Sequence, residues 1–252
     1  YFGFYWIPDL TPIGYYAMFA LIALSSLGIA CGALYRISTV VFFLAFTYME
    51  LVDATYYLNH YYFVSLVGLL LVFLPAHRQH SVDAWSGLTK RSSKVSAVAI
   101  NAIKLQLGLV YFLAGVAKLN ADWLLEAMPL AIWLPAQAHL PFIGEMMMFK
   151  ATAFAFSWAG AAYDLAIPFV LLSARLRWFG YVAVIAFHLM TWSFFQIGMF
   201  PFIMIGATLI FFSSDFHIKL QSHLGLRHGT FTAVFKRIPA YALNGLAVFF
   251  AF

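Results

Sequence analysis

Near its N-terminus the chain reads 13-IGYYAMFALIALSSLGIACGALY-35, a run without a single charged side chain. A helix needs about 20 consecutive apolar residues to cross the hydrocarbon core of a bilayer, so this stretch predicts a membrane-spanning helix. The whole chain has the same character, because 64% of its 252 residues are hydrophobic and only 9% are charged. Soluble domains are roughly half apolar and a quarter charged, so a water-soluble globule is excluded.

Similar apolar runs recur along the sequence and predict an all-α, polytopic transmembrane helical bundle of about seven to eight spans. The seven complete runs cover residues 13–35, 37–59, 61–76, 97–118, 148–173, 178–195 and 201–212. An eighth run starts near Ala240. We expect one domain over residues 1–252, truncated at both ends, because the chain starts without Met and stops inside an apolar run.

The basic residues predict the orientation of these spans. If the spans alternate in direction, eleven of the fourteen Lys and Arg residues fall on one side of the membrane: Arg36, Arg78, Lys90, Arg91, Lys94, Arg175, Arg177, Lys219, Arg227, Lys236 and Arg237. Such a bias marks the cytoplasmic face. Lys104 lies near the same face and can snorkel to it, so only Lys118 and Lys150 remain for the outer face. The positive charge therefore reports membrane topology, and nucleic acid is not an expected partner.

Two stretches between the spans have a mixed composition. Residues 121–147 carry two tryptophans and three prolines among apolar residues on the outer side, as expected of a segment that lies in the membrane interface or dips back into it. Residues 215–237 mix apolar and basic side chains on the inner side. That mixture predicts an amphipathic surface segment beside anionic membrane lipid.

The second run carries polar side chains that are costly in a membrane. Glu50, Asp53, Tyr57 and His60 follow at spacings of three, four and three residues, which places them on one face of a continuous helix. Ionisable groups at this depth are functional candidates by default. The alternative is a hydrogen-bonded stripe that only holds helices together.

The fourth run has a similar stripe, in which Tyr111 and Lys118 alternate with glycines such as Gly115. Lys104 and Lys118 are about 21 Å apart along a helix, so they belong to opposite faces of the membrane. Lys104 is expected to be a snorkelling anchor. Lys118 is either an interface lysine or a catalytic one, since burial among apolar neighbours lowers the pKa of a lysine and makes a neutral amine available as a base.

Two further polar positions lie in the fifth and sixth runs. Asp164 shares a face with Pro168, and there a helix-bending structural site and a functional carboxylate are equally open. His188 precedes Trp192 by one helical turn. A single histidine in a helix is either a satisfied hydrogen-bonding group or a ligand-binding one.

Metal chemistry is not expected. The sequence has no HExxH motif, no histidine pair at i and i+4, and a single cysteine, Cys31. Signatures of a Ser–His–Asp triad and of a phosphate-binding loop are absent as well.

The remaining candidates meet at the outer mouth of the predicted bundle. They are Lys118, the two imidazoles of His60 and His188, and the pair Asn59 and Asp122. An amine, two imidazoles and many aromatic rings next to lipid suit a hydrophobic acid–base or redox substrate such as a quinone.

Five short stretches also carry a family resemblance. They are NHYY at residues 59–62, SVD at 81–83, VYFLAGVAKLNADW at 110–123, FH at 187–188 and IGMF at 197–200. In these stretches the chain resembles the vitamin K-dependent gamma-carboxylases and their bacterial relatives that share the horizontally transferred transmembrane (HTTM) domain. The similarity runs in order from about residue 48 to residue 214, and the stretches at 110–123 and 197–200 are the most specific.

The resemblance implies an integral membrane enzyme whose active face is lumenal or periplasmic, here in a bacterial inner membrane. In that family a lysine deprotonates reduced vitamin K, which reacts with O2 to give a strongly basic alkoxide. That base removes the gamma proton of a protein Glu, CO2 adds to the carbanion, and vitamin K epoxide leaves. By motif position Lys118 matches the base, and His60 and His188 match histidines that contact the quinone.

The sequence departs from the family at several points. Ala117 stands where animal members have a second lysine, and Asn120 stands where they have an acid. We also expect the family's first span and its lumenal C-terminal domain to lie outside these residues. Quinone chemistry is therefore better supported than carboxylation of a Glu-containing protein substrate.

Two other hypotheses remain open from sequence. One is a non-enzymatic membrane subunit that binds quinone or lipid as part of a larger complex with partner subunits. The other is a transporter, which the intramembrane acids Glu50, Asp53 and Asp164 allow although no inverted repeat is visible.

Overall fold

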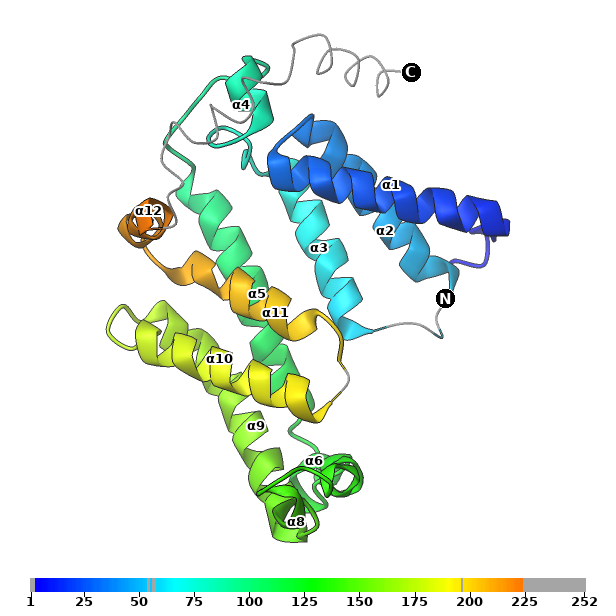
Figure 1. The fold of residues 1–252 in the computed structure, drawn as a ribbon, viewed down its shortest axis with the longest axis vertical. Helices are drawn as coiled ribbons and strands as arrows, with labels where there is room; N and C mark the ends of the chain where they lie inside the picture. The colour runs from blue at the N-terminus through cyan, green and yellow to red at the C-terminus, as the bar shows by residue number, and fades with distance from the viewer. Residues whose placement is uncertain (1–2, 54, 56–57, 196, 224–252) are drawn as a thin grey trace. The chain divides into compact units, whose positions relative to one another are not determined.

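The computed structural model describes residues 3–53, 55, 58–195 and 197–223 of the chain. Within these residues all regular structure is helical, which confirms the all-α class (Figure 1). The chain divides into two compact units. The first contains residues 1–100 and 214–252, and the second contains residues 101–213.

Four helices are long and apolar enough to cross a membrane: α1 (Pro12–Cys31), α2 (Tyr35–Val52), α5 (Ala97–Ala117) and α9 (Lys150–Leu172). Each matches one of the predicted runs, although α2 ends earlier than expected. Two further apolar helical segments, His60–Phe73 and Phe200–Phe211, are shorter. The predicted eighth run near Ala240 lies outside the described residues.

The first unit is built on α1, α2 and α3 (Asn59–Phe73), which pack in sequence order. Helix α1 starts with Thr11 as its N-cap, whose side chain accepts a hydrogen bond from the Gly14 N–H. It ends at Gly32, whose φ of 62° lies in the left-handed region that glycine adopts without strain. The tight connection that follows lets α2 return directly along α1.

The connection between α1 and α2 is held by the segment that leads into α4 (Val82–Ser86). The carboxylate of Asp83 accepts hydrogen bonds from the backbone N–H groups of Leu34 at 2.7 Å and Tyr35 at 2.9 Å. These donors belong to the first turn of α2, where N–H groups have no partner inside the helix and a carboxylate is favoured. A Cβ added at Gly32 would lie 2.3 Å from the Cβ of Ser81, so the two segments are in close contact. The SVD stretch at residues 81–83 therefore acts as a cap.

His77 lies beside this cap. Its ring stacks on that of Tyr35, with ring centroids 4.6 Å apart and an interplanar angle of 18°. Burial lowers the pKa of His77; the charge of Asp83 opposes this shift, and the charges of Arg36 and Arg78 add to it. Burial therefore favours the neutral form of the imidazole.

Helix α2 is shorter than the run 37–59 that the sequence predicts, because it ends at Val52. Asp53 is extended, with φ of −134°, and its Oδ1 accepts hydrogen bonds from Thr55 N at 2.8 Å and Thr55 Oγ1 at 2.7 Å. These hydrogen bonds hold the pKa of the Asp53 carboxyl below its usual range. Asp side chains compete in this way with the helix for nearby backbone groups, and the competition ends α2 here.

The predicted helix face through Glu50, Asp53, Tyr57 and His60 is therefore wrong. Glu50 lies in the last turn of α2, Asp53 follows its end, and His60 lies in the first turn of the next helix, α3. Tyr57 lies outside the described residues. The spacing argument failed because it assumed one continuous helix through residues 50–60.

In the second unit, α9 packs against α10 (Arg177–Phe194), and α10 packs against α11 (Phe200–Ala207). Helix α11 continues into the short 3-10 helix η3 (Thr208–Phe211). The buried face of α9 includes Ser157, Gly160, Asp164 and Pro168. Pro168 has no N–H to donate, so the carbonyl of Asp164, four residues earlier, lacks its helical partner. The predicted polar face of this span thus points into the protein.

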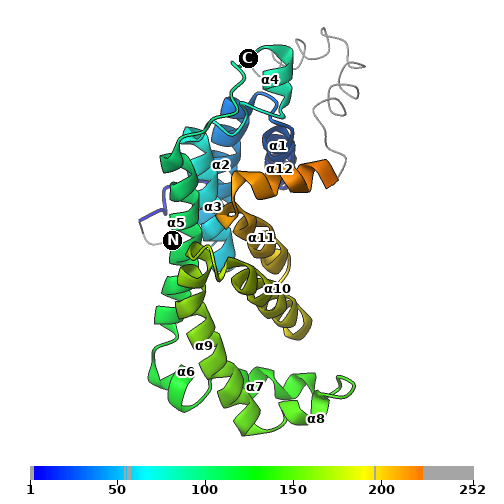
Figure 2. The same cartoon turned by 90° about the vertical axis from the view of Figure 1, so that its left-hand side faces the viewer.

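Residues 121–147 fold into four short elements: α6 (Ala121–Leu125), α7 (Leu130–Trp133), η2 (Pro135–Gln137) and α8 (Gly144–Met147). Figure 2 shows α6, α7 and α8 near the N-terminal end of α9. Leu134 and Met147 are buried together with Ala153 of α9 and Phe194 of α10. The side-chain amide of Gln137 donates a hydrogen bond to the Phe194 carbonyl at 2.8 Å. This segment therefore has a small hydrophobic core of its own.

The predicted amphipathic segment 215–237 is described only in its first part. Residues Ser214–His223 form α12, in which no residue is buried. An amphipathic helix that lies on a surface shows this exposure. Residues 224–237 lie outside the described part of the chain.

Candidate functional site

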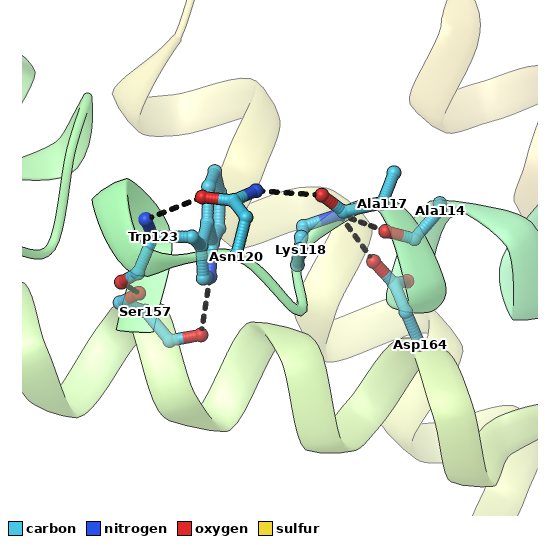
Figure 3. A network of polar contacts seen from close by, with 7 residues as sticks. All are labelled: Ala114, Ala117, Lys118, Asn120, Trp123, Ser157 and Asp164. Atoms are coloured by element: carbon cyan, nitrogen blue, oxygen red, sulfur yellow. Dashed lines mark hydrogen bonds and ion pairs between the residues drawn. The ribbon is translucent and has the colours of Figure 1, made fainter. Parts of the chain in front are cut away.

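Lys118 is held by three groups of the second unit (Figure 3). Its Nζ lies 2.7 Å from Oδ2 of Asp164 and donates a second hydrogen bond to the Ala114 carbonyl at 3.2 Å. It also lies 5.1 Å from the centroid of the Trp123 ring, a distance at which a cation is attracted to the ring face. These contacts come from α5, α6 and α9, so the ammonium group joins three helices.

The ion pair is largely shielded from water. The side chain of Lys118 is 21% exposed and that of Asp164 is 6% exposed. Charges removed from water are costly unless they are paired, and each partner then stabilises the charged form of the other. Within the described part of the chain this is the only ion pair between side chains. The two charges that are shielded from water are thus paired with each other.

A close approach of two helices brings the pair together. A Cβ added at Gly115 would lie 2.8 Å from the backbone nitrogen of Leu165, so only glycine allows α5 to approach α9 this closely. The turn that follows ends α5, and the Lys118 N–H donates to the Gly115 carbonyl at 3.0 Å. Leu165 is the neighbour of Asp164 in the chain. The contact at Gly115 therefore sets the distance between the amine and the carboxylate.

The Trp123 ring is fixed by its own hydrogen bonds. Its backbone N–H donates to Oδ1 of Asn120 at 2.9 Å, so Asn120 is the N-cap of α6. The Asn120 side-chain amide also donates to the Ala117 carbonyl at 2.8 Å. The indole N–H donates to the Ser157 carbonyl at 2.8 Å, and the Ser157 hydroxyl donates to the Trp123 carbonyl. An asparagine at position 120 thus has a structural function as the cap of α6.

Sequence reasoning missed Trp123 as a partner of Lys118 and considered it only as an interface residue. The available signal was the Asn120 cap followed three residues later by an aromatic ring. Such a cap folds the chain back toward the preceding helix end, and this brings the ring to the last turn of α5.

A second cluster of polar and aromatic side chains lies in the same unit. Tyr111 is 3% exposed and His188 is 2% exposed, and their ring centroids are 5.9 Å apart. Tyr111 also meets the ring of Tyr163 edge-on at 6.0 Å. The hydroxyls of both tyrosines are buried and have no hydrogen-bond partner among the described groups. Buried hydroxyls without partners are unusual in a folded protein, so both positions are candidates for a polar function.

The hydrogen bond of His188 assigns its tautomer. Its Nδ1 lies 2.9 Å from the Val184 carbonyl, which can only accept, so Nδ1 carries a proton. In the neutral imidazole Nε2 is then an acceptor, able to take a proton from a hydroxyl group.

The ion pair and the tyrosine cluster are parts of one surface of the second unit. Tyr163 directly precedes Asp164 on α9. Tyr111 precedes Lys118 by two helical turns on α5, about 10 Å along the helix axis. The amine, the carboxylate and the two hydroxyls therefore all come from the neighbouring parts of α5 and α9.

Two predicted residues of this unit lie apart from the ion pair. Asp122 is exposed in the first turn of α6. Trp192 is 51% exposed and contacts the ring of Phe202 at 5.5 Å. Within the described residues, no hydrogen bond, ion pair or ring contact joins either of them to Lys118 or Asp164.

The other predicted residues belong to the first unit. His60 lies in the first turn of α3, with its ring 4.7 Å from that of Tyr61, and Asn59 is the first residue of the same helix. Their approach to Lys118 stays a prediction. Glu50 of α2 accepts a hydrogen bond from the Ser65 hydroxyl of α3 and so joins these two helices.

Within the described ranges, no three His, Cys, Asp or Glu side chains are grouped so that they could hold a metal ion. The chemistry available at the site is therefore that of an amine, a carboxylate, phenols and an imidazole.

Comparison with known proteins identifies the family of the chain. No solved structure matches the chain. The family model of the HTTM domain matches residues 1–216, which is most of the sequence and includes all helices of the second unit. With four helices of membrane-spanning length and composition, the protein is an integral membrane protein. The chain belongs to the HTTM domain family.

Proposed function

We propose that this protein is an enzyme of the vitamin K-dependent gamma-carboxylase type, in which Lys118 deprotonates a reduced quinone at the outer face of the membrane. The observation that carries the proposal is the shielded pair of Lys118 with Asp164, 2.7 Å apart and beside the Trp123 ring. Buried, charge-paired groups of this kind are common at catalytic sites.

The residues near the pair fit a reduced quinone. Tyr111 and Tyr163 supply buried hydroxyls that lack partners, and Nε2 of His188 supplies an acceptor. These groups would hold the oxygen atoms of the ring, and neighbouring aromatic side chains would cover its faces. When bound, reduced vitamin K supplies, with O2, the base strength needed to fix CO2 on a glutamate side chain.

Because Lys118 is paired with Asp164 as a charged ammonium group, it has to lose a proton before it can act as a base. A charged Lys118 cannot accept a proton, so its proton must first pass along the short hydrogen bond to Oδ2 of Asp164. Asp164 then holds that proton, and the neutral amine of Lys118 is free to take one from a quinol hydroxyl. Replacing Asp164 by Asn keeps the hydrogen bond but removes this acceptor.

The proposed topology agrees with this function. We propose seven to eight spans, with the basic loops in the cytoplasm of a bacterium and Lys118 at the periplasmic side of the inner membrane. Lys118 follows the end of α5, and Lys104 lies about 21 Å away along the same helix, near the cytoplasmic side. A Glu-containing protein would then be carboxylated outside the cytoplasm.

The test uses the full-length protein in lipid discs with reduced vitamin K, O2, labelled CO2 and a Glu-containing peptide. Epoxide and fixed CO2 are measured together for the parent, Lys118→Ala, Asp164→Asn and the control Lys150→Ala. Lys150 is a second lysine at the outer side, exposed beside the ring of Phe154. We expect Lys118→Ala to lower both products about 100-fold or more, the usual contribution of a general base, and Lys150→Ala to leave them unchanged.

The other outcomes separate the hypotheses. Epoxide without fixed CO2 would keep the quinol chemistry and indicate another acceptor. If the folded parent protein gives neither product, the hypothesis of an enzyme is refuted.

A non-enzymatic quinone- or lipid-binding subunit is the second candidate. The observation that favours it is that protein groups already satisfy Lys118, which bridges α5 and α9 as a structural ion pair does. This alternative predicts that a double variant, Lys118→Met with Asp164→Leu, still binds the quinone with parental affinity. An enzyme with Lys118 as base would lose turnover in the same variant.

A further inference from the structure

The first unit contains a cavity that the proposed quinol chemistry does not use. It has a volume of about 660 Å³, within the range of about 300–1,000 Å³ that is typical of small-molecule sites. It lies where α1 begins, α2 ends and α3 begins. Most of its wall is apolar and aromatic, with Phe19 and Ile22 from α1 and Phe46 from α2.

The polar part of the wall is acidic. Glu50 and Asp53 line the cavity at the end of α2, and none of the described lining residues is basic. One oxygen of Glu50 accepts the Ser65 hydroxyl, but the other, Oε1, is buried and has no hydrogen-bond partner among the described groups. A buried carboxylate oxygen without a donor is unusual in a folded protein, and a ligand with N–H groups would satisfy it.

The charge of the cavity selects the kind of ligand. A fatty acid or a phosphate group brings negative charge, which two carboxylates disfavour, and a quinol brings hydroxyl donors but no positive charge. A primary ammonium group offers a positive charge and N–H donors, and both match Glu50 and Asp53. Phe19 and Ile22 of α1 and Phe46 of α2 form the apolar wall beside the two acids, and an alkyl chain would contact them there.

We propose that this cavity binds a single-chain membrane amphiphile whose headgroup is a primary ammonium. The ammonium group donates to Oε1 of Glu50, with Asp53 adding charge, and the alkyl chain lies between α1 and α2. This site uses neither Lys118 nor Asp164, so its existence does not depend on the proposed quinol chemistry.

The test compares four ligands with the same alkyl chain and different headgroups: dodecylamine, dodecyltrimethylammonium, dodecanol and dodecanoate. Binding to the full protein in a neutral detergent is measured by native mass spectrometry over a concentration series. The trimethylammonium compound carries the charge without an N–H donor, and the alcohol carries a donor without charge. We expect dodecylamine to bind about tenfold more tightly than either, and dodecanoate to bind least, because charged hydrogen bonds are the stronger ones.

Three variants connect the binding to the cavity. Glu50→Gln keeps the shape of the side chain and should lower the affinity for dodecylamine about tenfold, to that of the alcohol. Ile22→Trp fills the apolar part of the cavity without changing a charge and should abolish binding of all four ligands. This second variant keeps the test valid if Glu50→Gln folds poorly. Glu126→Gln, an exposed acid in the second unit, is the control and should have no effect. Circular dichroism checks that each variant is folded.

Two results would overturn the proposal. One is equal binding of the amine and the alcohol to the parent protein. The other is a preference for the amine that persists in both Glu50→Gln and Ile22→Trp, since the amine would then bind elsewhere.

Discussion

The pair formed by Lys118 and Asp164 leads to a quantitative prediction that does not depend on any assigned activity. Asp164→Leu removes the carboxylate that lies 2.7 Å from the lysine amine. Breaking a buried ion pair costs about 3–5 kcal/mol, because the remaining charge is left without a partner. Lys118 keeps the Ala114 carbonyl and the Trp123 ring, and its side chain is 21% exposed. We therefore expect Asp164→Leu to cost about 2–3 kcal/mol.

The reverse substitution should cost more. Lys118→Met leaves Asp164, whose side chain is only 6% exposed, without its ion-pair partner. We expect a cost of about 3–4 kcal/mol, because the more buried charge has fewer other groups to stabilise it. The double variant replaces both charges by apolar side chains and should cost about 1 kcal/mol or less.

The assay is a double-mutant cycle on equilibrium unfolding in mixed micelles, followed by tryptophan fluorescence and circular dichroism. The expected coupling energy between the two positions is at least about 2 kcal/mol in magnitude. Lys150→Met, which removes an exposed lysine of the same unit, serves as the control and should change stability by less than about 0.5 kcal/mol. If the costs of the two single variants add within about 0.5 kcal/mol, the pair is not an energetic unit and the reasoning is refuted.

Three other substitutions test the packing and the cap. Gly115→Ala should lower the free energy of unfolding by about 1–3 kcal/mol, because its Cβ would lie 2.8 Å from the backbone of α9. The control Gly108→Ala should be tolerated, because its Cβ would meet its nearest neighbour at 3.7 Å. Equal costs for the two variants would contradict the close approach. Asp83→Ala removes the acceptor of two N–H groups at the start of α2 and should cost about 1–3 kcal/mol by the same measurement, with an unchanged stability arguing against the cap. Burial lowers the pKa of His77 below its ordinary 6.5, so the unfolded chain binds the proton more readily and stability should be lost as the pH falls below about 6.5. The variant His77→Phe keeps the stacking on Tyr35 and should reduce that loss of stability. Identical pH profiles of stability for the two proteins would exclude this cause.

The fold class could be predicted from the sequence because the solvent of a membrane protein imposes a simple constraint. Without water, backbone groups must pair within a segment, so apolar runs of sufficient length become helices. The runs at 97–118 and 148–173 accordingly match α5 and α9 within two residues at each end. The end of α2 was not predictable in this way, since it depends on the hydrogen bonds between Asp53 and Thr55 rather than on hydropathy.

The residues of the candidate site could be predicted because they are unusual in a membrane helix, but the contacts between them could not. A lysine at a span end and an aspartate within a span are visible as exceptions to the composition of a membrane helix. That Lys118 pairs with Asp164 depends on the approach of α5 to α9 at Gly115. Tyr163 also was not noticed, because a tyrosine is an ordinary residue in an aromatic-rich chain until burial leaves its hydroxyl without a partner.

The sequence by itself determined that the protein is an α-helical membrane protein, where its long apolar helices lie, and that Lys118, Asp164 and His188 are exceptional for their positions. These properties follow from local composition, because the cost of placing each side chain in lipid is set residue by residue. Only the tertiary structure decided that Lys118 is joined to Asp164 and Trp123, and that Asp83 caps α2. The physical reason is that distances between helices depend on side-chain packing between segments far apart in sequence, which no local pattern contains.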